Sequence, residues 1–175
     1  MQDTIELQEE KMAKKIEKTN VMRLLDQKKI DHAEYDFSDK CGGVAPTGVE
    51  VANELGKDVS MVFKTLVTQG ASKAYYVFVI PVAEELDLKK AAKAVSEKSI
   101  AMIKSKDLLG LTGYVHGGCS PIGMKKQFKT VVHESASSCE TIMFSAGKIG
   151  YQVEMPLASL EKICPLTLAD VICND

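Results

Sequence analysis

Apolar positions along the chain recur at helical spacing in some stretches and at strand spacing in others, and they predict a series of short elements. Thr19 or Asn20 can cap a helix that continues to about residue 28. A second helix follows the capping-box sequence Thr47-Gly48-Val49-Glu50 and stops before Gly56, a residue type that commonly ends helices in a left-handed conformation. Further helices are predicted over residues 88–95, 106–111 and 156–163.

Runs of β-branched and aromatic residues predict the strands. The clearest two span residues 61–67 and 75–80, and a hairpin-like loop at 69–73 separates them. Shorter strands are predicted at residues 33–37, 130–133, 141–144 and 151–155, and residues 100–103 are predicted to form a short strand or a turn of helix. Because hairpin loops recur and strict βαβ alternation is lacking, the pattern favours an α+β fold with a twisted, mixed, mostly antiparallel sheet surrounded by helices.

The length of 175 residues fits one domain with a short appendage. Residues 1–18 are charged and helix-prone, so we expect a helical N-terminal extension there and a single domain over residues 19–175. The N-terminus lacks the apolar segment of a secretory signal, and no apolar run approaches the ~20 residues that span a bilayer. These features predict a cytoplasmic protein that has no membrane partner.

Charge is nearly balanced overall but uneven locally. The formal net charge is −2, which excludes a protein that coats nucleic acid by bulk charge. Residues 31–60 hold seven acids and two lysines, whereas residues 86–106 hold six lysines and two acids. Residues 116–130 add three lysines and no acid. Two basic segments beside a glycine-rich loop indicate an anionic ligand, although charged runs are more often solvated faces.

Cysteine and histidine spacing argues against a metal site. The five cysteines are scattered singly without a C-x-x-C pair, and a cytoplasmic chain would keep them reduced. The three histidines form no pair at helical spacing. We therefore expect neither a metal nor a cofactor.

Lys64 is the first candidate for chemistry. Strand alternation places it on the face of Val62 and Leu66, in a strand that is mostly apolar on both faces. A lysine in that position costs free energy unless it meets an anion or extends its ammonium to water. The pattern alone leaves both interpretations open.

Glycine-containing segments are the second candidate. Gly117 and Gly118 lie in the irregular stretch 113–123, where backbone N–H groups can approach a ligand closely. The stretch 145–150 is a plain hairpin turn or a second ligand-binding loop. Cys119 and His116 could form a nucleophilic dyad, but a small buried thiol is the commoner fate of such a cysteine.

Four segments then occur in a recognisable order: Val62-Phe63-Lys64-Thr65-Leu66, residues 86–93, residues 112–123 and residues 145–150. Together they resemble the motifs of the YbaK/EbsC family of Cys-tRNA(Pro) deacylases, and more remotely the editing domain inserted in bacterial prolyl-tRNA synthetases. The resemblance covers about residues 19–173. It implies the α+β fold already described and hydrolysis of the ester in a mischarged aminoacyl-tRNA.

The resemblance also assigns residues. Lys64 falls on the family's hallmark lysine, which holds the tRNA acceptor end, and Gly117 and Gly118 fall on the glycine pair near the scissile ester; these three are the predicted catalytic residues. Residues predicted to bind substrate are Tyr35, Thr65, Ser120, Ser145 and Lys148. Departures from the family pattern occur at Cys119, Ala146 and Thr47, and Thr47 stands where many relatives carry an aromatic residue that would shape the aminoacyl pocket.

The resemblance implies a substrate-assisted reaction in which the thiol of the bound cysteine attacks its own carbonyl. The protein then supplies positioning and oxyanion stabilisation rather than a nucleophile. Cys-tRNA(Pro) is the expected substrate, Cys-tRNA(Cys) a further one, and prolyl-tRNA synthetase a candidate partner. Two alternatives stay open: a deacylase for another small aminoacyl group on tRNA(Pro), such as alanine, and a non-catalytic tRNA-binding module that assists a synthetase.

Overall fold

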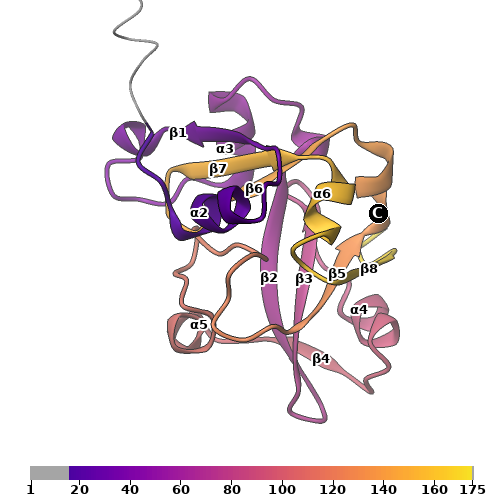
Figure 1. Ribbon diagram of the computed structural model, residues 1–175. Helices are drawn as coiled ribbons and strands as arrows, with labels where there is room; N and C mark the ends of the chain where they lie inside the picture. The colour runs from indigo at the N-terminus through magenta and orange to yellow at the C-terminus, as the bar shows by residue number, and fades with distance from the viewer. Residues whose placement is uncertain (1–15, 175) are drawn as a thin grey trace, which may run out of the picture.

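The computed structural model describes residues 16–174 of the chain, and its strands form two sheets (Figure 1). The smaller sheet is antiparallel, in the order β1-β7-β6, and consists of β1 (Ala33–Asp36), β7 (Tyr151–Met155) and β6 (Ile142–Ser145). The larger sheet has the order β4-β2-β3-β5-β8 and consists of β4 (Ile100–Met102), β2 (Phe63–Gly70), β3 (Tyr75–Pro81), β5 (Lys129–His133) and β8 (Leu166–Ala169).

The larger sheet is mixed. Its first pairings, of β2 with β4 and with β3, are antiparallel, whereas β5 runs parallel to both β3 and β8. The two sheets meet at a single parallel bridge between Val62 and Met143. The predicted α+β fold with a mostly antiparallel, mixed arrangement is confirmed.

Helices cover the faces of these sheets. They are α2 (Asn20–Gln27), α3 (Gly48–Glu54), α4 (Leu88–Ala94), α5 (Ser105–Thr112) and α6 (Leu157–Glu161), with 3-10 turns at Ser38–Lys40, Val59–Met61 and Glu134–Ser138. Helix α2 contributes Val21, Met22 and Leu25 to the main core, which also contains apolar residues of β6 and β7. Helix α4 packs on the opposite face of the larger sheet, against Phe78 and Ile80.

Local signals account for several element boundaries. Thr19 caps α2 by accepting a hydrogen bond from the Met22 amide. Both hydrogen bonds of the predicted capping box between Thr47 and Glu50 are present at the start of α3. Gly56 follows that helix with φ +64°, as the sequence predicts.

The structure departs from the prediction at a few positions. Strand β8 was not predicted, and helix α6 ends at Glu161 rather than near residue 163, with Pro156 as its N-cap. Most of the predicted N-terminal extension, 1–18, lies outside the described residues, and residues 16–18 are not helical. Instead, the Lys18 ammonium bridges Asp26 and Glu34, which ties this end of the described chain to α2 and β1. No helix within residues 16–174 is long and apolar enough to cross a membrane.

Candidate active site

A cavity of about 220 Å³ lies where the two sheets diverge. Within the described chain, Val62, the residue before β2, bridges to Met143 of β6, and β2 pairs with β4 at Thr68–Gly70; no ladder is formed on that edge between these contacts. The intervening stretch of β2 therefore lines the cavity instead of a neighbouring strand. The other walls come from the start of α3, from α5, from the glycine-rich loop and from strands β6 and β7.

The cavity brings together part of the predicted site. Lys64, Thr65, Gly117 and Ser145 all line it, although they come from three separate segments of the chain. The other predicted residues are Tyr35, Gly118, Ser120 and Lys148, and the structure places these outside the lining. Each of the four contributes to the walls or to nearby structure, as described below.

Lys64 is half-buried at the cavity and pairs directly with Ile80 of β3, so the two side chains lie on the same face of the sheet. Burial lowers the pKa of its ammonium, and the negative field of Glu85 and Glu84 opposes that shift. Within residues 16–174, Lys64 makes no hydrogen bond or ion pair. A partly desolvated cation without a partner is suited to bind an anionic group of a ligand.

The loop at residues 113–123 is held in shape by its own side chains. The Tyr114 hydroxyl donates to the Ile122 carbonyl, and the Tyr114 amide donates to the Thr112 hydroxyl. Ser120 is fully buried and its hydroxyl accepts the Ile122 amide at 3.3 Å. Ser120, predicted to bind substrate, therefore stabilises the loop rather than contacting the cavity.

The two adjacent glycines play different parts. The Gly118 N–H donates to the Val115 carbonyl at 3.0 Å, so it is not available as an oxyanion donor in this conformation. A Cβ at Gly118 would lie 3.1 Å from the Ile149 amide nitrogen, so this glycine allows close packing against the hairpin at 145–150. Gly117 lines the cavity with φ +84°, and no partner for its N–H is found within the described residues. Gly117 is thus the better placed of the pair to contact a ligand.

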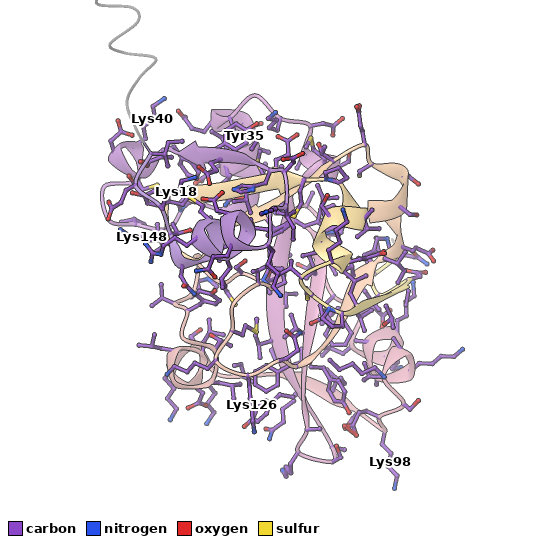
Figure 2. The ribbon with its side chains drawn as sticks, viewed as in Figure 1. Lys18, Tyr35, Lys40, Lys98, Lys126 and Lys148 are labelled. Atoms are coloured by element: carbon purple, nitrogen blue, oxygen red, sulfur yellow. The ribbon has the colours of Figure 1, made fainter. Side chains whose placement is uncertain are left out.

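Ser145 lies at the end of β6, directly opposite Gln152 of β7. Its hydroxyl accepts the Gly147 amide at 3.2 Å, which leaves the hydroxyl proton for another acceptor. The segment 145–150 is a hairpin turn that also brings a side chain to the cavity. Lys148, in the same turn (Figure 2), is exposed, lies over the Tyr151 ring at 5.2 Å and does not line the cavity.

Tyr35 belongs to a polar cluster beside the cavity. Its hydroxyl donates to Glu154 at 2.8 Å, and Glu154 also accepts the Thr141 hydroxyl and pairs with Lys57 at 3.0 Å. Although burial of Glu154 acts to raise its pKa, the net shift is downward because these three donors favour the carboxylate. Since Lys57 follows α3, the cluster fixes the small sheet against the helix that forms one cavity wall. Tyr35 therefore helps to position the cavity wall formed by α3 and does not itself line the cavity.

Sequence reasoning missed Gln152. This side chain lies between Tyr35 and Ser145 in a row across the small sheet, lines the cavity and is 8% exposed. A polar residue in the alternating run Tyr151-Gln152-Val153-Glu154 has the appearance of a solvent-facing strand position. Only the packing of one sheet beside the other turns it inward.

Gly48 and Val82 face each other on the opposite wall. A Cβ built on Gly48 would lie 2.3 Å from the Val82 side chain, and both residues line the cavity. Thr47 also lines it, but the Thr47 hydroxyl is used as the cap of α3. The cavity wall beside Thr47 is therefore closely packed, because the contact between Gly48 and Val82 leaves no space for a methyl group on Gly48.

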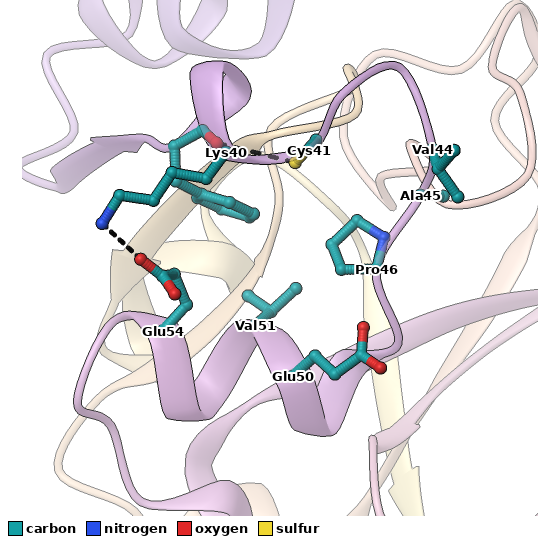
Figure 3. Close-up of a pocket in the computed structure, with 9 residues that line it drawn as sticks. Lys40, Cys41, Val44, Ala45, Pro46, Glu50, Val51 and Glu54 are labelled. Carbon is teal, nitrogen blue, oxygen red and sulfur yellow. Dashed lines mark hydrogen bonds and ion pairs between the residues drawn. The ribbon is translucent and has the colours of Figure 1, made fainter.

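A second cavity of about 270 Å³ adjoins the first and shares Pro46 and Val51 with it (Figure 3). It lies between α3 and the segment that carries Val44 and Ala45, and an ion pair between Lys40 and Glu54 crosses one side. None of the predicted site residues lines this second cavity. The first cavity is therefore the candidate active site.

One group of described side chains has the spacing of metal ligands: Asp26, His32 and Glu34. The Lys18 ammonium already lies 2.7 Å from Glu34 and 3.1 Å from Asp26, and the His32 ring is bonded to the Ile30 carbonyl and to Glu34. A lysine ammonium thus occupies the place of a cation among these residues. The group is not part of the cavity lining.

Cys119 lines the cavity but is 8% exposed, and burial raises the pKa of its thiol to about 12. A thiol with such a pKa is almost fully protonated at neutral pH and is a poor nucleophile. His116 is exposed, and no hydrogen bond joins it to Cys119 among the residues described.

We expect Cys119→Ser to keep its activity within a few-fold of wild type, because the buried thiol takes no part in bond formation. Hydrolysis of aminoacyl-tRNA, the reaction that the sequence resemblance implies, is measured on the variant to check this, alongside alkylation of the native protein followed by mass spectrometry. Cys41 and Cys173 are only partly buried and should be alkylated before Cys119. An inactive but folded Cys119→Ser, together with a covalent acyl intermediate on wild type, would instead support the dyad.

Comparisons with known proteins identify the family to which the chain is similar. A sequence model of the aminoacyl-tRNA editing domain matches residues 42–163. Over 146 residues the chain is 47% identical to an Enterococcus faecalis (strain ATCC 700802 / V583) protein assigned as the Cys-tRNA(Pro)/Cys-tRNA(Cys) deacylase EbsC. The matched region covers 82% of this chain and 88% of that protein.

Solved structures extend the likeness to the fold. A crystal structure assigned to a trans-editing enzyme for prolyl-tRNA synthetase matches with a TM-score of 0.75 at 21% identity, over 88% of this chain and 95% of that one. A crystal structure of a protein described as hypothetical matches with a TM-score of 0.79 at 20% identity, over 89% of this chain and 100% of that one. At these identities the similarity concerns the arrangement of strands and helices.

Proposed function

The chain belongs to the YbaK/EbsC family of aminoacyl-tRNA deacylases, and from this premise we propose that it hydrolyses cysteine mischarged onto tRNA(Pro). Cys-tRNA(Cys) is a second substrate, since the related Enterococcus faecalis protein carries both in its name. Prolyl-tRNA synthetase is the proposed source of the mischarged tRNA. The observation that carries the proposal is the cavity of about 220 Å³ that contains Lys64, Gly117 and Ser145 but no activated protein nucleophile.

In the proposed complex, Lys64 binds the phosphate next to the terminal adenosine. Its partly buried ammonium has no recorded partner in residues 16–174, so the phosphate would provide the missing counter-charge. Gly117 and Ser145 both line the cavity, and the Gly117 N–H and the Ser145 hydroxyl would donate to the ester carbonyl oxygen. Developing negative charge on that oxygen would be stabilised by these donors in the transition state.

The thiol of the bound cysteine supplies the nucleophile. Its sulfur attacks the carbonyl carbon of the same residue, the ester C–O bond breaks, and the released tRNA hydroxyl takes up the proton that the thiol gave up. Water then opens the resulting cyclic thioester to free cysteine. This route is consistent with Cys119, the one thiol in the cavity lining, having a pKa of about 12.

A deacylation assay tests the proposal directly. Wild-type protein is incubated with Cys-tRNA(Pro), Ala-tRNA(Pro) and Ser-tRNA, and loss of the aminoacyl group is followed in each case. Cleavage of the cysteinyl ester with little cleavage of the seryl ester is expected, since a hydroxyl is a much poorer nucleophile than a thiol. Preferential cleavage of the alanyl ester would contradict the thiol-assisted route, and absence of any cleavage would contradict the proposed function.

Binding of tRNA should weaken with added salt, because exposed lysines would contact its phosphates. Lys106 of α5 and Lys126 of the loop that follows are exposed, and α5 contributes Leu108 to the cavity. Lys89 and Lys93 lie on α4, which packs against Phe78 and Ile80 on the sheet face that also carries Lys64 (Figure 1). Lys90 is engaged with Asp170 and the Ile172 carbonyl and is not a free contact.

We therefore expect Lys106→Ala and Lys126→Ala each to reduce the slope of log K against log salt by about one. The matched control Lys98→Ala, at an exposed lysine, should leave the slope unchanged. Binding of deacylated tRNA between low and physiological salt gives the slopes. An affinity that does not respond to salt in wild type would rule out a lysine–phosphate interface.

A further inference from the structure

Buried polar atoms without partners occur at few places in the described chain. Three side chains have one: Thr65, Ser135 and Gln152. Thr65 Oγ1 and Gln152 Oε1 belong to residues that line the candidate active site, whereas Ser135 lies in the 3-10 turn after β5, outside that lining. Leaving such an atom unbonded costs free energy, so a pair of them in one cavity points to a ligand that satisfies them.

The two oxygens are delivered from the two sheets. Gln152 is held in the row Tyr35–Gln152–Ser145 across the small sheet, and its side chain is 8% exposed. Thr65 lies on β2, next to Lys64 in sequence but on the other face of the strand. Both residues line the cavity, but neighbouring atoms cover the two oxygens in this structure, so each side chain would turn about its rotatable bonds to present its oxygen to a ligand.

Donors and acceptors in the cavity then divide between parts of the substrate. The donors are Lys64, the Gly117 N–H and the Ser145 hydroxyl, which suit the phosphate and the ester carbonyl. The amide oxygen of Gln152 can only accept a hydrogen bond and suits neither of those groups, whereas the Thr65 hydroxyl can accept beside it or donate. The part of an aminoacyl ester that carries donors and a positive charge is its α-ammonium.

We propose that Gln152 and Thr65 bind the α-ammonium of the aminoacyl group, so that the enzyme selects tRNAs that carry a free amino acid over those whose amino group is blocked. An N-acylated substrate loses the positive charge and two of its N–H donors, and it adds bulk in a cavity of about 220 Å³. Initiator and peptidyl esters share this chemistry and would be spared. The inference rests on the proposed deacylation.

The test compares Cys-tRNA(Pro) with N-acetyl-Cys-tRNA(Pro) under single-turnover conditions. Each enzymatic rate is divided by the spontaneous hydrolysis rate of the same ester, because acylation of the amino group alters ester lability. N-acetylation leaves the thiol free, so it does not disable the substrate-assisted step. Wild type should prefer the free amino form by about 10- to 100-fold after this correction, the range expected for hydrogen bonds to a charged group.

Variants locate the preference. Gln152→Met removes the acceptor at similar length and should lose about 10- to 100-fold on the free substrate while leaving the N-acetyl substrate unaffected. Gln152→Glu keeps an oxygen acceptor and should retain the preference. Ser135→Ala is the matched control, because it removes a buried unpartnered oxygen outside the cavity and should change neither rate. Thr65→Val, nearly isosteric, gives a second test if Gln152→Met fails to fold.

Equal corrected rates on the two substrates, or equal losses on both in Gln152→Met, would overturn the inference. If wild type cleaves no aminoacyl-tRNA, the proposed function fails. A binding measurement then tests separately whether Gln152 and Thr65 bind an α-ammonium. In that case adenosine joined to cysteine by a stable amide is compared with its N-acetyl form. Tighter binding of the free form, lost in Gln152→Met, supports the subsite, and equal binding rejects it.

Discussion

Lys64→Met should lower kcat/KM for deacylation by about 100-fold or more and leave the protein at least as stable as wild type. The loss follows from removing the cation proposed to hold the acceptor-end phosphate. The stability follows from burial, which lowers the pKa of Lys64 and so makes its charged form unfavourable in the folded protein. Methionine keeps the apolar stem without the charge.

The pH dependence of stability has a definite sign at this position. The pKa of Lys64 is lower in the folded protein than in the unfolded chain, so between the two pKa values the unfolded chain binds more protons. Stability from this group therefore rises with pH through that range. The advantage of Lys64→Met over wild type should be full at neutral pH and should shrink as pH rises through the folded pKa.

Single-turnover kinetics and thermal unfolding measured across pH check both parts. Lys98→Met is the control, since Lys98 is exposed and lies toward the end of the molecule where the β2–β3 hairpin turns (Figure 2). A folded Lys64→Met with nearly wild-type kinetics would remove Lys64 from the site.

Gly117→Ala is expected to reduce activity by about 100-fold, the usual loss when one oxyanion donor is displaced. Gly117 has φ +84°, which alanine adopts only with strain, and the added Cβ would lie 2.4 Å from the Cβ of Ala45. The loop must shift to relieve that contact, and its N–H would move with it. Gly118→Ala should also be harmful, but by pushing on the hairpin backbone at Ile149.

Gly110→Ala provides the comparison for Gly117→Ala. Gly110 lies within α5, and a Cβ there would meet nothing within 4 Å. This variant should keep full activity and gain about 0.5–1 kcal/mol of stability. Kinetics and thermal unfolding of both variants are measured together. If Gly117→Ala retains wild-type kinetics, the glycine-rich loop has no direct part in the reaction.

Elements with a local signal could be predicted from the sequence. The capping box before α3 and the β2–β3 hairpin depend on residues close together in the chain, and both are present. Strand β8 carries no comparable signal, because it is a short edge strand with Thr167 and Leu168 exposed. Its pairing with β5 is decided by residues more than thirty positions earlier in the chain.

The candidate site divides along the same line. Lys64 was conspicuous because a lysine in an apolar strand is costly wherever the strand lies. Gln152 was not, since its burial depends on how one sheet stands beside the other. From the sequence, Gly118 and Ser120 are candidates as good as Gly117, because all three lie in the same loop. In the structure, hydrogen bonds within the loop engage Gly118 and Ser120.

The contact between Gly48 and Val82 makes these two positions epistatic. With 2.3 Å between a new Cβ at position 48 and the valine side chain, no larger residue fits at 48 while valine stays at 82. If the two positions change one at a time, a smaller residue must replace Val82 before a larger one can replace Gly48. The protein that carries only the first substitution then has a wider pocket. Lineages that change aminoacyl preference through this wall would pass through a less selective ancestor.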